Sequence, residues 1–152
     1  MDKPLVSVIM PAFNGETVIR EAIESILHQT YPDIELVVID DGSTDTTGSI
    51  LEEYKDKLKS YRQENHGFSH AINKGISLAQ GKYLAFIGQD DVFLPEKIEV
   101  QVAILENNPE CVLAHSPAIF INEEGRELYK WGGNRAIYQW SLDTDNIIGN
   151  LF

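Results

Sequence analysis

The sequence has one cysteine, few basic residues and no long apolar run. Cys111 alone cannot form an internal disulfide, so nothing indicates an oxidising compartment. Twelve Lys and Arg against 24 Asp and Glu give a net charge of −12, which disfavours nucleic acid or an anionic membrane surface as the main partner. No apolar run approaches the roughly 20 residues of a membrane span, and the N-terminus lacks signal-peptide features. We therefore expect a cytoplasmic protein that binds no nucleic acid.

Several common nucleotide- and metal-binding patterns are also absent. Neither G-x-x-x-x-G-K-[ST] nor G-x-G-x-x-G follows the first apolar run, so the P-loop and dinucleotide-fingerprint classes lack their defining geometry. A response-regulator domain would need an Asp after its third strand and a Lys after its last, and neither is in place. The four histidines show no metal-ligand spacing, since His66 and His70 lie four apart across a predicted loop-to-helix boundary.

What is present is an alternation of strand and helix patterns. Short apolar runs at Leu5–Met10, Ile34–Ile39 and Tyr83–Ile87 predict strands buried on both faces, hence parallel. The single chain of 152 residues therefore predicts a doubly wound α/β fold, with a mostly parallel sheet and helices on both faces. Helices are expected near residues 15–30, 46–58, 68–81 and 95–109, the third of them ending at Gly81. Two further strands are expected at residues 58–62 and 111–121.

Three polar loops follow the three apolar runs, at Pro11–Glu16, Asp40–Asp45 and Gly88–Asp91. In open α/β sheets, ligands bind beyond the carboxyl ends of the strands, near the point where the strand order reverses. If the strands are parallel, the three loops lie along one edge of the sheet. This convergence predicts a ligand site there.

Two of these loops carry neighbouring acids. Asp40 and Asp41 have a structural explanation, an Asx-type turn in which Gly42 takes a positive φ before the next helix. Asp90 and Asp91 would repel each other unless a cation or donors lie between them. Mg²⁺ and Mn²⁺ prefer such oxygen ligands and complete their shell with water and substrate phosphates. Alternatively, Asp90 and Asp91 belong to an acidic loop that caps the following helix. The pair alone does not distinguish such a cap from a metal site.

Taken in order, the loops resemble family 2 glycosyltransferases with the GT-A fold. The similar motifs are P-A-F-N, Q-T-Y-P, D-D-G-S-T-D, N-x-G-x-x-x-A-x-N-x-G and Q-D-D-x-x-x-P, within residues 5–105. The resemblance implies a GT-A, Rossmann-like nucleotide-diphospho-sugar transferase fold. Residues 1–152 would be a single truncated domain whose C-terminal acceptor part is missing. Residues 1–105 would be its nucleotide-sugar-binding core, and 106–152 the start of the acceptor-side region.

The resemblance also implies roles for particular residues. Pro11, Ala12 and Phe13 would line the base pocket. Asp41 would hydrogen-bond the base, typically a uracil, and Asp40 would support it. The nucleotide-binding residues expected in this way are Pro11, Ala12, Phe13, Asn14, Asp40, Asp41, Asn73, Gly88, Gln89 and Asp90.

Asp90 and Asp91 match the end of the family's D-x-D element, whose carboxylates hold Mg²⁺ or Mn²⁺ against the diphosphate. The sequence departs from the family at Gly88, where many members carry the first Asp of the motif, so metal binding is expected to be weaker or to depend more on the diphosphate. Ile72 stands where many relatives carry Arg, which removes one phosphate donor.

The implied activity is a metal-dependent transfer of a hexosyl group from a nucleotide-diphosphate sugar, most often a UDP-sugar, with inversion. The acceptor would be a glycan or a lipid-linked glycan, in polysaccharide or glycoconjugate biosynthesis, and the full-length protein could lie peripherally at the inner face of the membrane. An inverting transfer needs a general base. The acids that follow the metal loop and its helix lack the family's context, so we expect the base beyond Phe152; they are Glu123, Glu124, Glu127, Asp143 and Asp145.

Other functions remain open at this stage. The fragment would have weak or no activity, and a catalytically silent nucleotide-sugar-binding or regulatory module is the main alternative. A nucleotidyltransferase would place a G-G-x-G-T-R-like loop after the first strand, which "PAFNGE" does not supply. An exposed apolar surface that pairs chains as a homodimer is expected from Trp131, Trp140, Ile147, Ile148, Leu151 and Phe152.

Overall fold

The structure is a computed structural model that describes residues 3–122, 124–131 and 140–141, with side chains described as far as residue 130. The chain divides into two compact units, Met1–Ile98 and Glu99–Phe152. The three polar loops all belong to the first unit.

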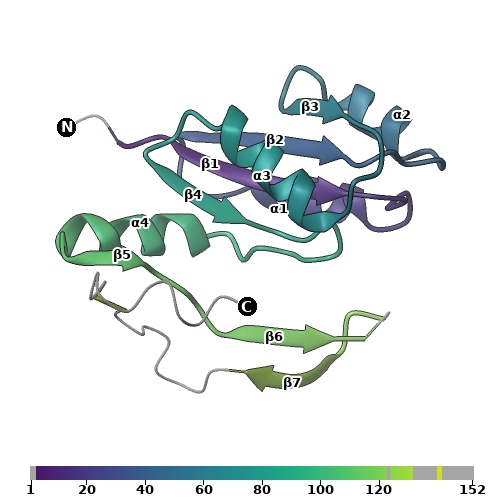
Figure 1. The fold of residues 1–152 in the computed structure, drawn as a ribbon. Coiled ribbons are helices and arrows are strands. Elements are labelled where there is room, and N and C mark those ends of the chain that lie inside the picture. Colours follow the sequence, from purple (N-terminus) through teal and green to yellow (C-terminus); the bar gives the residue numbers. More distant parts are fainter. Residues whose placement is uncertain (1–2, 123, 132–139, 142–152) are drawn as a thin grey trace. The chain divides into compact units, whose positions relative to one another are not determined.

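The first unit is a parallel sheet with helices (Figure 1). Its strands are β1 (Val6–Ala12), β2 (Ile34–Asp40), β3 (Lys59–Arg62) and β4 (Tyr83–Phe86), in the order β3-β2-β1-β4, and each neighbouring pair is parallel. Its helices are α1 (Ile19–Leu27), α2 (Thr47–Glu53) and α3 (Phe68–Leu78), and α4 (Lys97–Asn107) begins at its end. The chain moves outward from β1 to β3 and then returns to place β4 on the other side of β1. The gap between β1 and β4 is therefore the topological switch point.

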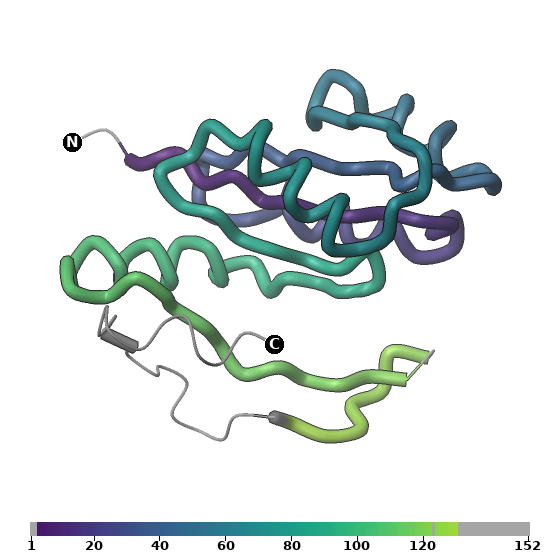
Figure 2. The backbone as a smooth tube through the Cα atoms, in the orientation of Figure 1, coloured from purple at the N-terminus to yellow at the C-terminus, as the bar shows by residue number. Residues whose placement is uncertain are grey.

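Helices cover both faces of this sheet (Figure 1). Every residue of β1 is buried, as expected for a parallel strand between two helix layers. In Figure 1, α3 lies in front of the sheet and α1 behind it, and the backbone trace in Figure 2 shows β1 running between β2 and β4. A Cβ on Gly75 would collide with Ile9, so glycine lets α3 approach β1 closely. The predicted doubly wound sheet is confirmed.

Strand register sets the level of the loops. Ala12 pairs with Asp40, and Asp40 pairs with Arg62, so β1, β2 and β3 end at the same height. The backbone N–H of Asp41 donates to the carbonyl of Ala12 at 2.8 Å and continues this pairing by one residue. The loops after β1 and β2 therefore leave the sheet side by side.

Two elements differ from the sequence-based boundaries. The third helix ends at Leu78, before Gly81. A Cβ on Gly81 would lie 2.6 Å from the backbone N of Ser7, so glycine is needed for a close approach to β1 rather than to end the helix. The strand expected at 111–121 is two strands, β5 (Cys111–Leu113) and β6 (Ala118–Ile121). Pro117 lies between them and has no N–H for a ladder.

The second unit contains antiparallel pairs. β6 pairs with β7 (Glu127–Trp131), and β5 pairs with β8 (Trp140–Ser141). The ring of Phe120 stacks on that of Tyr129 across the first pair, with centroids 4.7 Å apart. The apolar surface expected to pair chains lies outside the residues whose side chains are described, so the homodimer stays a prediction. None of the described helices is both long and apolar enough to span a membrane.

Candidate functional site

A pocket of about 310 Å³ opens at the carboxyl edge of the sheet, at the switch point between β1 and β4. The ends of β1 and β2 contribute to its wall, together with the loop before α3, the first turn of α3 and the loop after β4. Among the residues expected from sequence to bind a nucleotide, those that line this pocket are Pro11, Ala12, Phe13, Asp41, Gly88, Gln89 and Asp90. The sequence-derived loops thus surround one cavity.

Asp41 is a buried carboxylate in the wall of this pocket. Its Oδ1 accepts hydrogen bonds from Gln63 Nε2 at 2.7 Å and from the His66 N–H at 3.0 Å, and its Oδ2 accepts one from the Gly67 N–H at 2.8 Å. Burial raises the pKa of Asp41, but these hydrogen bonds outweigh burial and hold the pKa below its ordinary value. An ionised carboxylate offers about four acceptor positions. The described residues fill three of these positions, and one on Oδ2 is left for a donor in the pocket.

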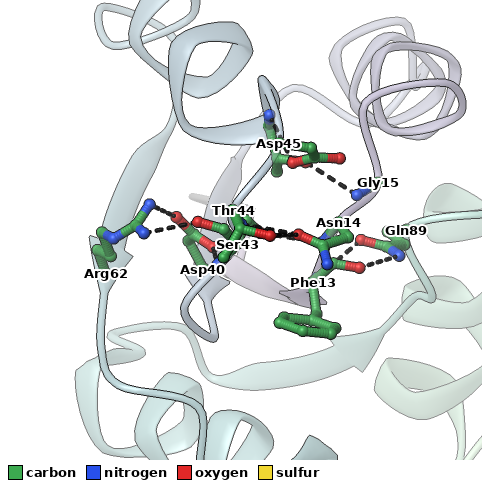
Figure 3. Close-up of polar contacts among 10 residues, drawn as sticks. Phe13, Asn14, Gly15, Asp40, Ser43, Thr44, Asp45, Arg62 and Gln89 are labelled. Carbon is green, nitrogen blue, oxygen red and sulfur yellow. Dashed lines mark hydrogen bonds and ion pairs between the residues drawn. The ribbon is translucent and has the colours of Figure 1, made fainter.

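Asp40 is buried but does not line the pocket. Its Oδ2 accepts a hydrogen bond from Arg62 Nη1 at 2.8 Å, and its Oδ1 accepts one from the Ser43 N–H at 2.8 Å. Arg62 Nη2 also donates to the Ser43 carbonyl at 2.6 Å (Figure 3). These bonds compensate the buried charge and fix the loop that carries Asp41. Asp40 therefore holds the loop and does not face the cavity.

Asn14 also lies outside the pocket wall and joins two loops instead (Figure 3). Its backbone N–H donates to Ser43 Oγ at 3.0 Å, and its Oδ1 accepts the Thr44 N–H at 2.8 Å. The φ of Asn14 is 49°, in the left-handed region that Asn tolerates better than most residues. The loops after β1 and β2 are thereby tied together.

Gln89 joins the loop after β4 to the loop after β1. Its Oε1 accepts the Phe13 N–H at 2.9 Å, and its Nε2 donates to the Phe13 carbonyl at 3.0 Å (Figure 3). A Cβ on Gly15 would collide with this amide. These two hydrogen bonds cross the switch point between β1 and β4. They hold together the edge of the pocket that Phe13 and Gln89 form.

Gly15→Ala is expected to lower the free energy of unfolding by about 1–3 kcal/mol, because the added methyl group displaces the Gln89 amide and overpacks the loop. Urea denaturation measures this change. Gly48→Ala is the matched control, since a Cβ there meets its nearest atom, Arg62 Nη1, at 3.4 Å within α2. That variant should be neutral or slightly more stable. Equal losses in the two variants would contradict the prediction.

Asp90 and Asp91 converge above Gly88. A Cβ on Gly88 would lie 2.8 Å from both Asp90 Oδ1 and Asp91 Oδ2, so both oxygens border the space that the missing side chain leaves. Gly88 also donates its N–H to Asp91 Oδ2 at 3.2 Å. Two carboxylates directed at one point suit a hard divalent cation such as Mg²⁺ or Mn²⁺. The residues present fit such an ion.

The donor set at this point is small. Within the part of the chain that the structure describes, no three His, Cys, Asp or Glu side chains gather as metal ligands. A cation held by two carboxylates keeps most of its coordination positions for water and phosphate oxygens. If residue 88 were an Asp, its Cβ would occupy the space that the Asp90 and Asp91 oxygens border.

Other residues fall differently from expectation. Asn73 is exposed on α3 and does not line the pocket. Pocket residues that the sequence reasoning left without a role lie before and within the first turn of α3: Asn65, Gly67, Phe68 and Ala71. The N-x-G-x-x-x-A motif is the sequence feature that could have indicated these residues. Its glycine, Gly67, adopts a φ of 87° and thereby directs its N–H to Asp41.

Comparison with known proteins identifies the family. The Glycosyl transferase family 2 model matches residues 7–150. The chain is 42% identical over 127 residues to an uncharacterized glycosyltransferase of Rickettsia prowazekii, covering 83% of this chain and 40% of that protein. It is 35% identical over 134 residues to a putative teichuronic acid biosynthesis glycosyltransferase of Bacillus subtilis, covering 85% of this chain and 52% of that protein. The chain belongs to glycosyltransferase family 2, and it spans about half or less of the length of these relatives.

A solved structure extends the likeness to the fold. S. aureus TarS 1-349 in complex with UDP-GlcNAc superimposes with a TM-score of 0.66 at 29% identity, covering 78% of this chain and 34% of TarS 1-349. The parallel sheet is thus of the GT-A type, as the sequence motifs predict.

Proposed function

We propose that the pocket binds the nucleotide of a nucleotide-diphosphate sugar, a UDP-sugar in particular. The observation that carries this proposal is Asp41, whose one remaining acceptor position belongs to a buried, ionised carboxylate in the pocket wall. Uracil presents a ring N–H between two carbonyl groups, which matches a single strong acceptor. The TarS structure with UDP-GlcNAc supports this choice of base.

Aromatic and apolar surface surrounds Asp41. Phe13 is 44% exposed and Phe68 is 68% exposed, and both side chains belong to the pocket. Exposed aromatic faces are platforms on which nucleic acid bases stack. Pro11 and Ala12 complete the apolar wall. The pocket thus offers stacking for a base and one acceptor for its edge.

Asp90 and Asp91 are the residues that would hold Mg²⁺ or Mn²⁺. When bound, such an ion screens the diphosphate and stabilises it as a leaving group. The chain carries a net charge of −12 and by itself disfavours an anionic ligand. The proposed cation site would lie beside the base pocket, because Asp90 lines the pocket and its Oδ1, like Asp91 Oδ2, borders the space above Gly88.

For the whole enzyme we propose an inverting hexosyl transfer to a glycan or lipid-linked acceptor, in polysaccharide or glycoconjugate biosynthesis in the cytoplasm. The Bacillus subtilis relative, a putative teichuronic acid biosynthesis enzyme, supports this role. Glu124 and Glu127 lie in the second unit, whereas Glu123, Asp143 and Asp145 fall outside the described residues. We propose that the general base follows Phe152 in a longer protein.

Calorimetry with UDP and CDP, each with and without Mn²⁺, tests the proposal. The two ligands have nearly the same size and charge, but neutral cytosine has no hydrogen at N3 and cannot offer Asp41 the ring N–H that uracil presents; its only Watson–Crick-edge donor is the N4 amino group, at a different position. UDP is expected to bind more tightly than CDP, and more tightly with Mn²⁺ than without it. Equal binding of both would contradict the role of Asp41, and no binding of either would contradict the nucleotide site. UDP binding by a full-length protein that transfers no sugar would favour a silent binding module.

A further inference from the structure

Gln63 lies between Asp41 and a histidine of α3. Its Nε2 is 2.7 Å from Asp41 Oδ1 and 3.0 Å from His70 Nδ1. Gln63 follows β3, and His70 belongs to the first turn of α3. One amide group therefore connects the ends of β2 and β3 to the helix.

The chemistry of these three groups fixes their protonation. Ionised Asp41 has no hydrogen to donate, so the atom that faces it must be the NH₂ nitrogen of Gln63 and not its oxygen. The second hydrogen of this NH₂ group then serves His70 Nδ1. That ring nitrogen must accept, which requires a neutral His70 whose proton is on Nε2.

We propose that Gln63 and His70 are positioning residues that hold Asp41 in place for the nucleotide base, and that they do so only while His70 is neutral. The inference rests on the proposed role of Asp41. A proton taken from solvent onto His70 Nδ1 turns an acceptor into a donor that faces the Gln63 NH₂ group. Gln63 then turns away, and Asp41 loses one of its three donors. Nucleotide affinity therefore falls as the pH falls.

Other ionisable groups surround this contact and must be separated from it. The His66 ring lies 4.8 Å from that of His70, but His66 reaches Asp41 through its backbone N–H, so its ring can be replaced without removing that bond. By their place in the chain, the charged and titratable neighbours of His70 and Gln63 are Asp41 after β2, Arg62 and Glu64 on either side of Gln63, His66 before α3 and Lys74 one turn further along α3.

His70→Asn is the matched variant for this test. Asn Oδ1 stands at the same number of bonds from Cβ as His Nδ1, and it accepts a hydrogen bond at any pH. His70 is exposed, so the variant should fold normally. Gln63→Ala removes the connecting amide. His66→Asn removes the neighbouring titratable ring and keeps the backbone donor to Asp41.

The experiment is UDP binding by calorimetry between pH 8 and pH 5.5, with Mn²⁺ present. Histidine ordinarily changes charge within this range. The affinity of the wild-type protein is expected to fall about fivefold to tenfold relative to His70→Asn over this range, which corresponds to the loss of one hydrogen bond of typical strength. Because UDP titrates identically with both proteins, its own phosphate ionisation cancels in the ratio. His66→Asn should keep the wild-type pH dependence, and Gln63→Ala should bind weakly at every pH.

Some results would overturn the inference. Parallel pH profiles for wild type and His70→Asn would do so, as would a profile flattened by His66→Asn alone. An NMR measurement of the imidazole nitrogens in the free protein is independent of nucleotide. It should show the His70 proton on Nε2 at pH 8, and a proton on Nδ1 would overturn the relay. Absence of UDP binding at all pH values would instead contradict the proposed function, and the NMR result would then decide the relay alone.

Discussion

Asp41→Asn is expected to weaken UDP binding about 10- to 100-fold. The amide is neutral, and its NH₂ group must face one of the hydrogen-bond donors that Asp41 now accepts from, at Gln63, His66 and Gly67. The same mismatch leaves a buried donor without a partner, so the free energy of unfolding should fall by about 1–3 kcal/mol. Calorimetry measures the first effect and urea denaturation the second.

Asp56→Asn is the control for this variant, since it makes the same chemical change at an exposed position after α2. It should change neither UDP affinity nor stability. If Asp41→Asn bound UDP as tightly as Asp56→Asn, the carboxylate would have no role in recognising the base.

The pKa of Asp41 adds a pH dependence with a definite sign. Its hydrogen bonds hold the folded-state pKa below the ordinary value, despite burial. The resulting stability is present above the unfolded-state pKa and is lost as the pH falls through the folded-state value. Asp41→Asn should therefore lose less stability than the wild type between neutral and acidic pH, as measured by urea denaturation at several pH values.

Asp90→Asn and Asp91→Asn are expected to remove the gain in UDP affinity that Mn²⁺ provides. Each variant replaces one of the two carboxylates that, among the described residues, border the space above Gly88. Each variant should bind Mn²⁺ at least about 10- to 100-fold more weakly, which is the loss seen when a residue that hydrogen-bonds a metal ligand is changed. UDP binding without Mn²⁺ should change little in Asp91→Asn, because Asp91 does not line the pocket. Titration of Mn²⁺ into the UDP complex measures the effect.

Two further variants separate ligation from general charge. Glu96→Gln removes an exposed acid a few residues after the pair and should leave the Mn²⁺ dependence intact. Gly88→Ala keeps both acids but puts a methyl group where their oxygens converge, so the dependence should weaken while stability changes little. Retention of the full Mn²⁺ effect in both Asp90→Asn and Asp91→Asn would contradict the cation site.

Much of the scaffold could be predicted because burial on both faces leaves a plain signal. The apolar runs that became β1 and β2 are each interrupted by a single polar residue, Ser7 and Glu35, and their parallel pairing brings the following loops to one edge. Gly81 shows the limit of such signals. A glycine after a helical pattern indicates either a helix end or a close approach, and only the position of Ser7 distinguishes them.

The side-chain connections of the candidate site could not be predicted, because they depend on how distant segments align. Gln89 meets the backbone of Phe13 only because β4 lies beside β1, at a separation of 76 residues along the chain. Gln63 meets Asp41 and His70 only once β3 and α3 are in place. The sequence motifs indicated which residues belong to the pocket edge, but not which of them contact each other.

The reciprocal contact between Gln89 and Phe13 has a thermodynamic consequence. The two loops that it joins are each free to sample other conformations in an open sheet edge, and ordering them costs entropy. With both hydrogen bonds formed, that cost is met during folding rather than during ligand association. A group that binds beside Phe13 therefore finds the loop of Asp90 already ordered, and its affinity is not reduced by the entropy cost of ordering that loop.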